Sequence, residues 1–285
     1  MRCRDCRSVF RDITPARFAQ IHDEAFQDLG HIESLLAFAG DRPLHALWDL
    51  LALPGGSVLE IGPGSGHLLA AARDAGCTVE AVESSAVHRD YIRDTWDIGA
   101  VYPTMDDIPA GRSFDTVVAI NVFEHVYDTA AFLVAVRNVL APGGTFYLST
   151  SNARSLEAAL LRTWWPMCKV HDHVSFPSPA GLAIAARRSG LRVGRIWSTG
   201  LPLELPVSAL AAARDRALAR RGAAKPAAAG PVAARPVCTS GNENSAPGAK
   251  TALARFYSLA GPFDPTCRVL GALGRAGSVK ATLLR

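Results

Sequence analysis

Residues 57–85 read Ser-Val-Leu-Glu-Ile-Gly-Pro-Gly-Ser-Gly-His-Leu-Leu-Ala-Ala-Ala-Arg-Asp-Ala-Gly-Cys-Thr-Val-Glu-Ala-Val-Glu-Ser-Ser. Val58–Ile61 is a short apolar run that predicts a buried strand, and the glycine-rich stretch after it ends that strand. The Ala and Leu spacing of 67–75 predicts a helix ended by Gly76, and Thr78–Val82 predicts a second strand. This order of strand, glycine loop, helix and strand is typical of a nucleotide-binding βαβ unit, so we expect an α/β fold.

The glycine loop and the end of the second strand carry the residue types of a ligand site. Glycines let the backbone turn sharply and let a ligand lie against the main chain, and the helix behind them presents unpaired N–H groups. Glu83 follows the second strand, where a carboxylate can accept hydrogen bonds from ribose hydroxyls, and Glu60 stands two residues before the first glycine. The glycines stand at Gly62, Gly64 and Gly66. This is not the Gly-x-Gly-x-x-Gly spacing of dinucleotide enzymes, which disfavours a nicotinamide-dependent oxidoreductase.

The pattern Glu-x-Gly-x-Gly-x-Gly followed by an acid resembles motif I of class I S-adenosylmethionine-dependent methyltransferases. Three later segments match that family in the same order: the buried Phe-Asp strand of 113–121, the Glu-His-Val of 124–126, and the helix, Leu-x-Pro-Gly-Gly turn and strand of 128–152. The resemblance covers roughly residues 57–152. It implies a Rossmann-like, seven-stranded, mostly parallel sheet with an antiparallel last strand and an N-terminal helical cap.

The resemblance also implies S-adenosylmethionine as cofactor and a set of residues that bind it. The loop after the short strand at 100–102 corresponds to the family's adenine-binding loop, where an acid meets the exocyclic amine and an apolar side chain covers the ring. Asn121 ends the buried strand and is expected to place its main chain or amide near the cofactor. The expected cofactor-binding residues are Glu60, Gly62, Gly64, Gly66, Glu83, Thr104, Met105, Asp106 and Asn121.

Methyl transfer to an oxygen or carbon atom of a small molecule is the predicted reaction. The cofactor carries the reactive methyl group, so the protein's main contribution is to hold the acceptor in line with it. His125 is the candidate general base, because imidazole titrates near neutrality and the Glu-His-Val segment borders the methyl site in relatives. A solvent-facing histidine at a helix start is the alternative. A domain that binds the cofactor without turnover remains the other reading of the chain.

Composition limits the partners. The chain has 285 residues and a formal net charge of +4, with a pI near 8.8, which is not the strong positive field of a dedicated nucleic-acid binder. The segment after the buried strand, Asn-Val-Phe-Glu, lacks the Asn-Pro-Pro-Tyr-like or cysteine motif of RNA methyltransferases. No apolar run approaches the length of a membrane span and no leader opens the chain, which predicts a cytoplasmic protein.

Cys3 and Cys6 form a CxxC knuckle at the start of the chain. Residues 1–13 resemble the second half of a zinc ribbon, which precedes the methyltransferase domain in a subgroup of bacterial small-molecule methyltransferases that includes ubiquinone-biosynthesis enzymes. One knuckle supplies two thiolates, whereas a structural zinc site needs four ligands, so we predict no bound metal. The other four cysteines are isolated, as in a protein with reduced thiols.

Two further regions have residue types that suit a substrate pocket. Residues 14–54 are expected to form helices that cover the cofactor, in which His22, Phe26 and His31 either line a pocket or pack. The stretch 164–176 is rich in aromatic residues and histidines, including His171 and His173. We expect it to be a loop whose histidines pack or contact substrate, with metal binding by His-x-His ranked last.

The remaining segments complete the predicted organisation. Residues 55–200 and 275–285 form the expected methyltransferase core, with a helix over 178–189, a strand over 190–198 and a closing antiparallel strand over 277–285. Residues 201–274 are the expected insertion, partly disordered and partly helical, because the stretch is rich in Ala, Pro and Gly and mildly basic. A basic, partly amphipathic insertion either contacts anionic lipid or is a solvated excursion.

Overall fold

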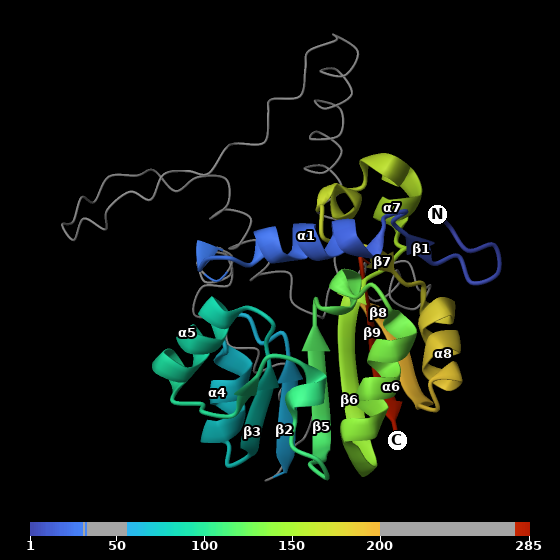
Figure 1. Cartoon of the computed structure of the whole chain (residues 1–285). Coiled ribbons are helices and arrows are strands. Elements are labelled where there is room, and N and C mark those ends of the chain that lie inside the picture. The colour runs from blue at the N-terminus through green and yellow to red at the C-terminus, as the bar shows by residue number, and fades with distance from the viewer. Residues whose placement is uncertain (31, 33–55, 200–276) are drawn as a thin grey trace, which may run out of the picture.

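A seven-stranded sheet forms the centre of the structure. The computed structural model describes residues 1–30, 32, 56–199 and 277–285 (Figure 1). The strands are β2 (Ser57–Ile61), β3 (Thr78–Val82), β4 (Val101–Tyr102), β5 (Phe114–Ile120), β6 (Leu140–Ser151), β8 (Arg192–Thr199) and β9 (Ser278–Leu284). They lie in the order β4-β3-β2-β5-β6-β9-β8. β9 runs opposite to the other six strands and pairs antiparallel with both β6 and β8. The expected mostly parallel sheet with an antiparallel last strand is confirmed.

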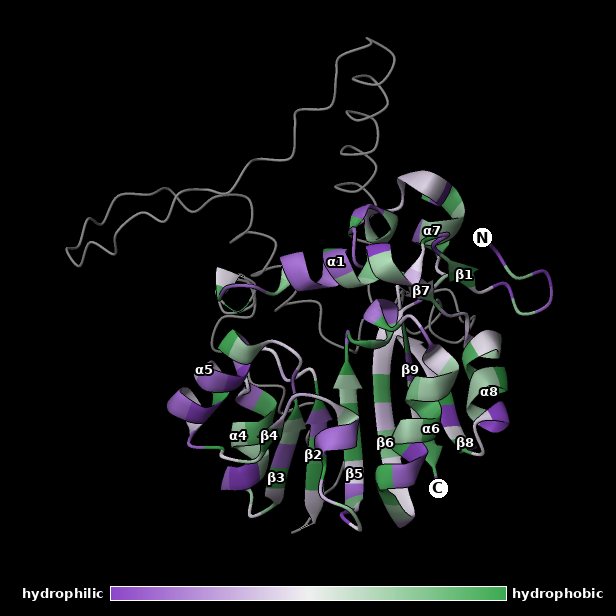
Figure 2. Ribbon diagram, viewed as in Figure 1, coloured by the Kyte–Doolittle hydropathy of each residue, from purple (hydrophilic) through white to green (hydrophobic). Residues whose placement is uncertain are grey.

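Helices cover both faces of this sheet. They are α4 (His67–Asp74), α5 (Ala86–Trp96), α6 (Thr129–Val139) and α8 (Pro179–Arg188), whereas α1 (Pro15–Ala25) and α7 (Leu156–Leu161) lie beyond the carboxyl ends of the strands (Figure 1). Successive residues of a strand point to opposite faces. Val117 of β5 therefore packs in the core cluster with residues of α6 and α8, whereas Val118 packs with residues of α4. Figure 2 shows hydrophobic residues along β2 and β5, while α5 is largely hydrophilic on its outer side.

The predicted turn at 141–144 lies inside a strand rather than before one. β6 begins at Leu140, which pairs with Phe114, and the next pair along the ladder is Thr145 with Thr116. Four residues of β6 therefore bulge where β5 supplies one. Gly143 has a φ of 78°, which lets the bulge turn back into the ladder. The strand that we predicted from Thr145 onward is thus extended at its N-terminal end.

The N-terminal segment lies over the carboxyl ends of the strands. β1 (Val9–Phe10) pairs antiparallel with β7 (Ser175–Phe176), more than 160 residues later in the chain. α1 then crosses above the sheet (Figure 1), with Thr14 as N-cap and Pro15 in its first turn. The Tyr127 hydroxyl donates to the Ile13 carbonyl at 3.2 Å, which ties the start of this helix to the segment after β5.

Several predictions of organisation fall outside the described residues. They are the later part of the helical cap expected over 14–54, of which only Ile32 is described beyond residue 30, and the insertion expected over 201–274. The proposed domain boundaries and the cytoplasmic localisation stay predictions. Among the residues that the structure does describe, no helix has the length and apolar content that a membrane crossing requires.

Candidate active site

The predicted site residues meet at the carboxyl edge of the sheet. β2 lies between β3 and β5, and Ile61 is in register with Val82 on one side and Ala119 on the other. The residues that follow these strands, including Glu83 and Asn121, therefore emerge at the same level. The strand order reverses between β2 and β5, because β3 and β4 lie beyond β2 while β6 lies beyond β5. Open α/β sheets bind ligands at such a switch point.

The glycine loop is held tightly in a conformation that only glycine adopts without strain. Gly62 and Gly66 have φ of 63° and 76°. A Cβ atom on Gly62 would lie 2.6 Å from Val122 Cγ2, and one on Gly66 would lie 2.6 Å from the indole of Trp96. The Trp96 Nε1–H donates to the Ser65 carbonyl at 2.7 Å. The loop is therefore packed from both sides, and its main chain is fixed beside the edge of the sheet.

Glu60 is a buried acid whose carboxylate is incompletely paired. The side chain is 4% exposed, and Oε2 has no hydrogen-bond partner among the described residues. Burial raises the pKa of Glu60 to about 8, against which a backbone hydrogen bond from Leu69 acts weakly. A buried, unpaired carboxylate oxygen costs free energy unless a cation or donor meets it. The end of β2 therefore offers an acceptor suited to a cationic group.

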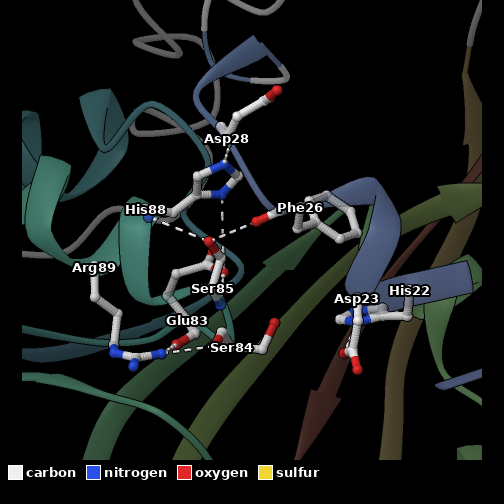
Figure 3. A network of polar contacts seen from close by, with 9 residues as sticks. All are labelled: His22, Asp23, Phe26, Asp28, Glu83, Ser84, Ser85, His88 and Arg89. Atoms are coloured by element: carbon white, nitrogen blue, oxygen red, sulfur yellow. Dashed lines mark hydrogen bonds and ion pairs between the residues drawn. The ribbon is translucent and has the colours of Figure 1, made fainter. Parts of the chain in front are cut away.

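Glu83 lies at the carboxyl end of β3, as the sequence predicts, and a network of polar contacts orients it (Figure 3). Its Oε1 accepts a hydrogen bond from the Ser85 N–H at 2.8 Å and lies 4.0 Å from Nδ1 of His88. Burial raises the pKa of Glu83, and the Ser85 backbone, His88 and Arg89 act against that rise. Oε1 is thus held toward Ser85 and His88, which fixes the orientation of the carboxyl group.

The same network ties the end of α1 to the sheet edge (Figure 3). The Ser85 hydroxyl donates to the Phe26 carbonyl at 2.8 Å, and Nε2 of His88 lies 2.8 Å from the Asp28 carbonyl. A carbonyl can only accept, so Nε2 of His88 carries the proton. The Phe26 ring lies 6.0 Å from the rings of both His88 and His125. Phe26 therefore lies between the Glu83 end of the site and its His125 end.

The predicted adenine-binding loop is a short 3-10 turn, η1 (Met105–Asp107), after β4. Asp107 caps this turn, because its Oδ2 accepts from the Thr104 N–H at 2.9 Å and from the Thr104 hydroxyl at 2.7 Å. The Thr104 hydroxyl is thereby engaged, while the Asp106 side chain is exposed and Met105 packs against the main core cluster. Met105 and Asp106 are thus the two predicted residues of the loop whose side chains do not hold the turn.

His125 lies at the other end of the site, in η2 (Phe123–His125) directly after β5. Its Nδ1 is 3.0 Å from Oδ2 of Asp172, a close contact that is not aligned as a hydrogen bond, and the two side chains are 18% and 10% exposed. Burial acts to raise the pKa of Asp172, but the neighbouring His125 and His173 outweigh it, and the pKa is lowered. His125 is therefore paired with a carboxylate, which contradicts the alternative that it faces solvent.

Further titratable side chains surround this pair. Oε2 of Glu124 accepts from the Thr150 hydroxyl at 2.6 Å, and burial raises the pKa of Glu124. Nδ1 of His173 lies 3.2 Å from the Met167 carbonyl, and burial together with His125 lowers the pKa of His173 to about 4. Glu124, His125 and His173 offer ligand atoms within 4.8 Å of one another. Because Glu124 and His125 are already engaged with Thr150 and Asp172, we assign no metal to the cluster.

The remaining histidines that the sequence suggested for a substrate pocket differ in their positions. His22 faces the cluster from α1, since His125 and Asp172 both influence its protonation, and burial lowers its pKa. His171 is exposed, and His31 lies outside the described residues. Asp172 and His88 were missed by the sequence analysis. The only available signal for Asp172 was its position inside the His-Asp-His stretch, and His88 gave none because it stands on an ordinary amphipathic helix.

A switch-point site with a fixed glycine loop and an acid after the next strand defines a Rossmann-like nucleotide-binding protein. The comparison with protein families gives the assignment. A model of the family described as "Methyltransferase domain" matches residues 31–195, more than half of the chain, and the chain belongs to this family. The assignment favours the methyltransferase reading over the nicotinamide-dependent alternative.

Curated relatives carry the same class of name. The chain is 33% identical over 142 residues to "Ubiquinone biosynthesis O-methyltransferase" of Xanthomonas campestris pv. campestris (strain B100), covering 42% of this chain and 56% of the relative. It is 30% identical over 181 residues to the protein of that name from Xanthomonas euvesicatoria pv. vesicatoria (strain 85-10), covering 53% and 72%. The chain thus spans about half the length of the first relative, 56%.

Solved structures show the same fold. A SAM-dependent methyltransferase from Archaeoglobus fulgidus is similar with a TM-score of 0.50 at 14% identity, covering 94% of this chain and 99% of that one. A putative sarcosine dimethylglycine methyltransferase from Galdieria sulphuraria has a TM-score of 0.50 at 15% identity, covering 85% and 83%. At such identities the likeness shows the fold alone.

Proposed function

We propose that the protein transfers a methyl group from S-adenosylmethionine to a hydroxyl oxygen of a small molecule. One observation carries the proposal: a partly unpaired buried acid, a glycine loop, a second oriented acid and a carboxylate-paired histidine follow one another along a single sheet edge. The named relatives are O-methyltransferases, which supports oxygen over carbon as the acceptor atom.

The residues of the glycine loop and of β3 fit the polar parts of the cofactor. The unpaired Oε2 of Glu60 suits the cofactor's ammonium group, and the partly buried main chain of Gly62 and Gly64, both at positive φ, is the backbone that we assign to its amino-acid portion. The oriented carboxyl group of Glu83 suits the ribose hydroxyls. These roles are the ones that the resemblance to the family implied for the same residues.

Two further groups are proposed to complete the cofactor site. Met105 covers the adenine ring, with Asp106 beside its amine and Thr104 holding the turn through Asp107. Asn121 has a φ of 54°, a conformation that is uncommon for a residue other than glycine. Strained residues of this kind gather at functional sites. We therefore propose that the exposed Asn121 side chain lies beside the reacting end of the cofactor.

At the reacting end, the protein's task is to position the acceptor and accept its proton. Bound S-adenosylmethionine supplies an electrophilic methyl group on a positively charged sulfur. A hydroxyl acceptor becomes more nucleophilic as it loses its proton, and His125 is the base that we assign to that step. Phe26 and His22 approach His125 from α1, so this helix supplies one wall of the acceptor pocket.

Incubation with methyl-labelled S-adenosylmethionine tests the proposal. The purified chain is mixed with the labelled cofactor and a panel of phenols, catechols, hydroxy acids and keto acids, and the label is followed by mass spectrometry. We expect labelled product from a hydroxyl acceptor and none with Glu83→Ala. Cofactor binding without transfer to any acceptor would instead support a binding module, and label on carbon would contradict the assignment of an oxygen acceptor.

A further inference from the structure

Asp172 is the group that faces the imidazole of His125, although the two are 47 positions apart in the chain. Its side chain is 10% exposed and lies in the loop between η4 (Pro166–Lys169) and β7. A carboxylate accepts and does not donate when ionised, so an imidazole that pairs with it through Nδ1 must carry a proton there. The other ring nitrogen, Nε2, then has the free electron pair that a base needs.

We propose that Asp172 is a positioning residue that fixes His125 in the Nδ1–H tautomer, with Nε2 free to take the proton of the acceptor. The proton transfer from a hydroxyl acceptor rests on the proposed function, whereas the tautomer of His125 does not depend on it. The contact is short but not aligned, and such contacts commonly tighten when a reaction complex forms. Asp172 itself does not touch the acceptor and acts through His125.

The charges around His125 single out Asp172 as its anionic partner. From α1, His22 has a lowered pKa because of burial and the neighbouring His125. From the loop, burial lowers the pKa of His173 to about 4. From η2 itself, burial raises the pKa of Glu124, whose carboxyl oxygen accepts from Thr150. Of the two carboxyl groups, Asp172 is the one whose oxygen lies 3.0 Å from the His125 ring, whereas Oε2 of Glu124 is engaged by the Thr150 hydroxyl. Asp172 is therefore the carboxylate placed to stabilise a protonated His125.

The N-terminal segment holds the loop that carries Asp172. The Arg11 guanidinium donates to the carbonyl groups of Cys168, Val170 and His173 at 2.9, 2.7 and 2.8 Å. The Arg11 N–H also donates to the Val174 carbonyl at 2.8 Å. These four bonds fix the backbone on both sides of Asp172.

The loop is tied to η2 as well. The Val174 N–H donates to the Glu124 carbonyl at 2.7 Å, one residue before His125. The segment after the CxxC knuckle thus acquires a role that needs no metal: it fixes Asp172 against His125. Ser8, in the same N-terminal segment, adds a further contact with the region after β7, because its Oγ accepts from the Ser178 N–H at 3.1 Å.

Nuclear magnetic resonance of ¹⁵N-histidine-labelled protein tests the tautomer without any knowledge of the acceptor. The His125 signals are identified by their loss in His125→Gln. In the full chain we expect His125 in the Nδ1–H form, and in Asp172→Ala we expect this preference to be lost. His171→Ala removes an exposed neighbour on the same loop and is expected to leave the His125 signals in place. An Nε2–H tautomer of His125 in the unmodified chain overturns the inference, even if Asp172→Ala fails to fold.

Kinetics with the best hydroxyl acceptor of the labelled panel gives the second readout. Asp172→Asn keeps the size of the side chain and removes its charge, so we expect kcat to fall about 100-fold while the cofactor Kd changes less than about twofold. The acid limb of the kcat profile should move to lower pH, because the imidazolium loses its anion. A kcat for Asp172→Asn within about twofold of the unmodified protein contradicts the positioning role.

The two proposals fail in different ways. Absence of turnover with the expected tautomer present removes the proposed function alone. Turnover that depends on His125 but not on Asp172 removes this inference alone. Treatment with EDTA should leave the activity unchanged, and loss of activity that Mg²⁺ or Zn²⁺ restores would assign the Glu124, His125 and His173 cluster to a metal and overturn the inference.

Discussion

Cofactor binding should release a proton from Glu60, and the release should disappear in Glu60→Gln. The pKa of Glu60 in the folded chain is about 8, against an ordinary value of 4.5. If the cofactor's ammonium meets the unpaired Oε2, it favours the charged carboxylate and lowers that pKa. At about pH 7 the Glu60 carboxyl group is therefore mostly protonated in the free protein, and it loses that proton when the complex forms.

The same group makes the stability of the free protein depend on pH. Because the folded pKa is raised above the unfolded value, the stability from Glu60 is fully present below about pH 4.5 and is lost as pH rises through about 8. Integrating that linkage from about pH 5.5 to about pH 7.5 gives a loss of roughly 2–3 kcal/mol in the free energy of unfolding. Glu60→Gln, which has no proton to lose, should lack this component.

Two measurements check the reasoning. Titration calorimetry of S-adenosylmethionine in buffers with different ionisation enthalpies gives the number of protons released, which we expect to approach one near pH 7 and to fall toward zero in Glu60→Gln. Urea unfolding at several pH values gives the stability slope. Equal proton release by both proteins, or parallel stability curves, would refute the assignment of Glu60 as the buried acid that meets the cofactor.

Three further predictions concern the loop, the base and the ribose acid. Gly62→Ala should weaken cofactor binding at least about tenfold and destabilise the fold by about 1–3 kcal/mol, because it adds a Cβ 2.6 Å from Val122 Cγ2 at a positive φ. Calorimetry and urea unfolding measure the two effects. Gly76→Ala, at φ 89° with open space around it, is the matched control for backbone strain alone. His125→Ala should lower kcat about 100-fold and leave the cofactor Kd within about twofold, as steady-state kinetics and calorimetry would measure, and unchanged turnover would remove its role as base. Glu83→Ala should largely abolish cofactor binding in the same calorimetric titration. The control is Glu80→Ala, which removes an acid of β3 that pairs with Arg112 and should retain binding. Equal affinity of Glu83→Ala and the unmodified chain would contradict the ribose assignment.

The core of the fold could be predicted from the sequence because its signals are local. The glycine loop, the buried run of β5 and the caps of α6 and α8 each lie within about a dozen residues, so periodicity and capping identify them. The antiparallel place of β9 came from the family resemblance, since the seven residues of that strand do not indicate their neighbours. The bulge of β6 was missed because a turn sequence does not reveal whether the strand ladder continues on its far side.

The candidate site was predictable only on its cofactor side. Glu60, the glycines and Glu83 stand at fixed positions relative to strand ends, so topology alone brings them together. Asp172 reaches His125 through the two-residue pairing of β1 with β7 and through the bonds of Arg11, which connect segments more than 150 residues apart. Nothing in the local sequence marks such short, distant pairings. The orientation of His125 is therefore a product of tertiary structure.

The most direct test of the central claim is to measure both products of the reaction in one experiment. The unmodified chain is incubated with methyl-labelled S-adenosylmethionine and the hydroxyl acceptor panel, and mass spectrometry follows labelled acceptor and S-adenosylhomocysteine together. We predict that the two appear in equal amounts and that both are lost in Glu83→Ala. Cofactor that binds but stays intact with every acceptor, or S-adenosylhomocysteine formed at the same rate by Glu83→Ala, would contradict the account.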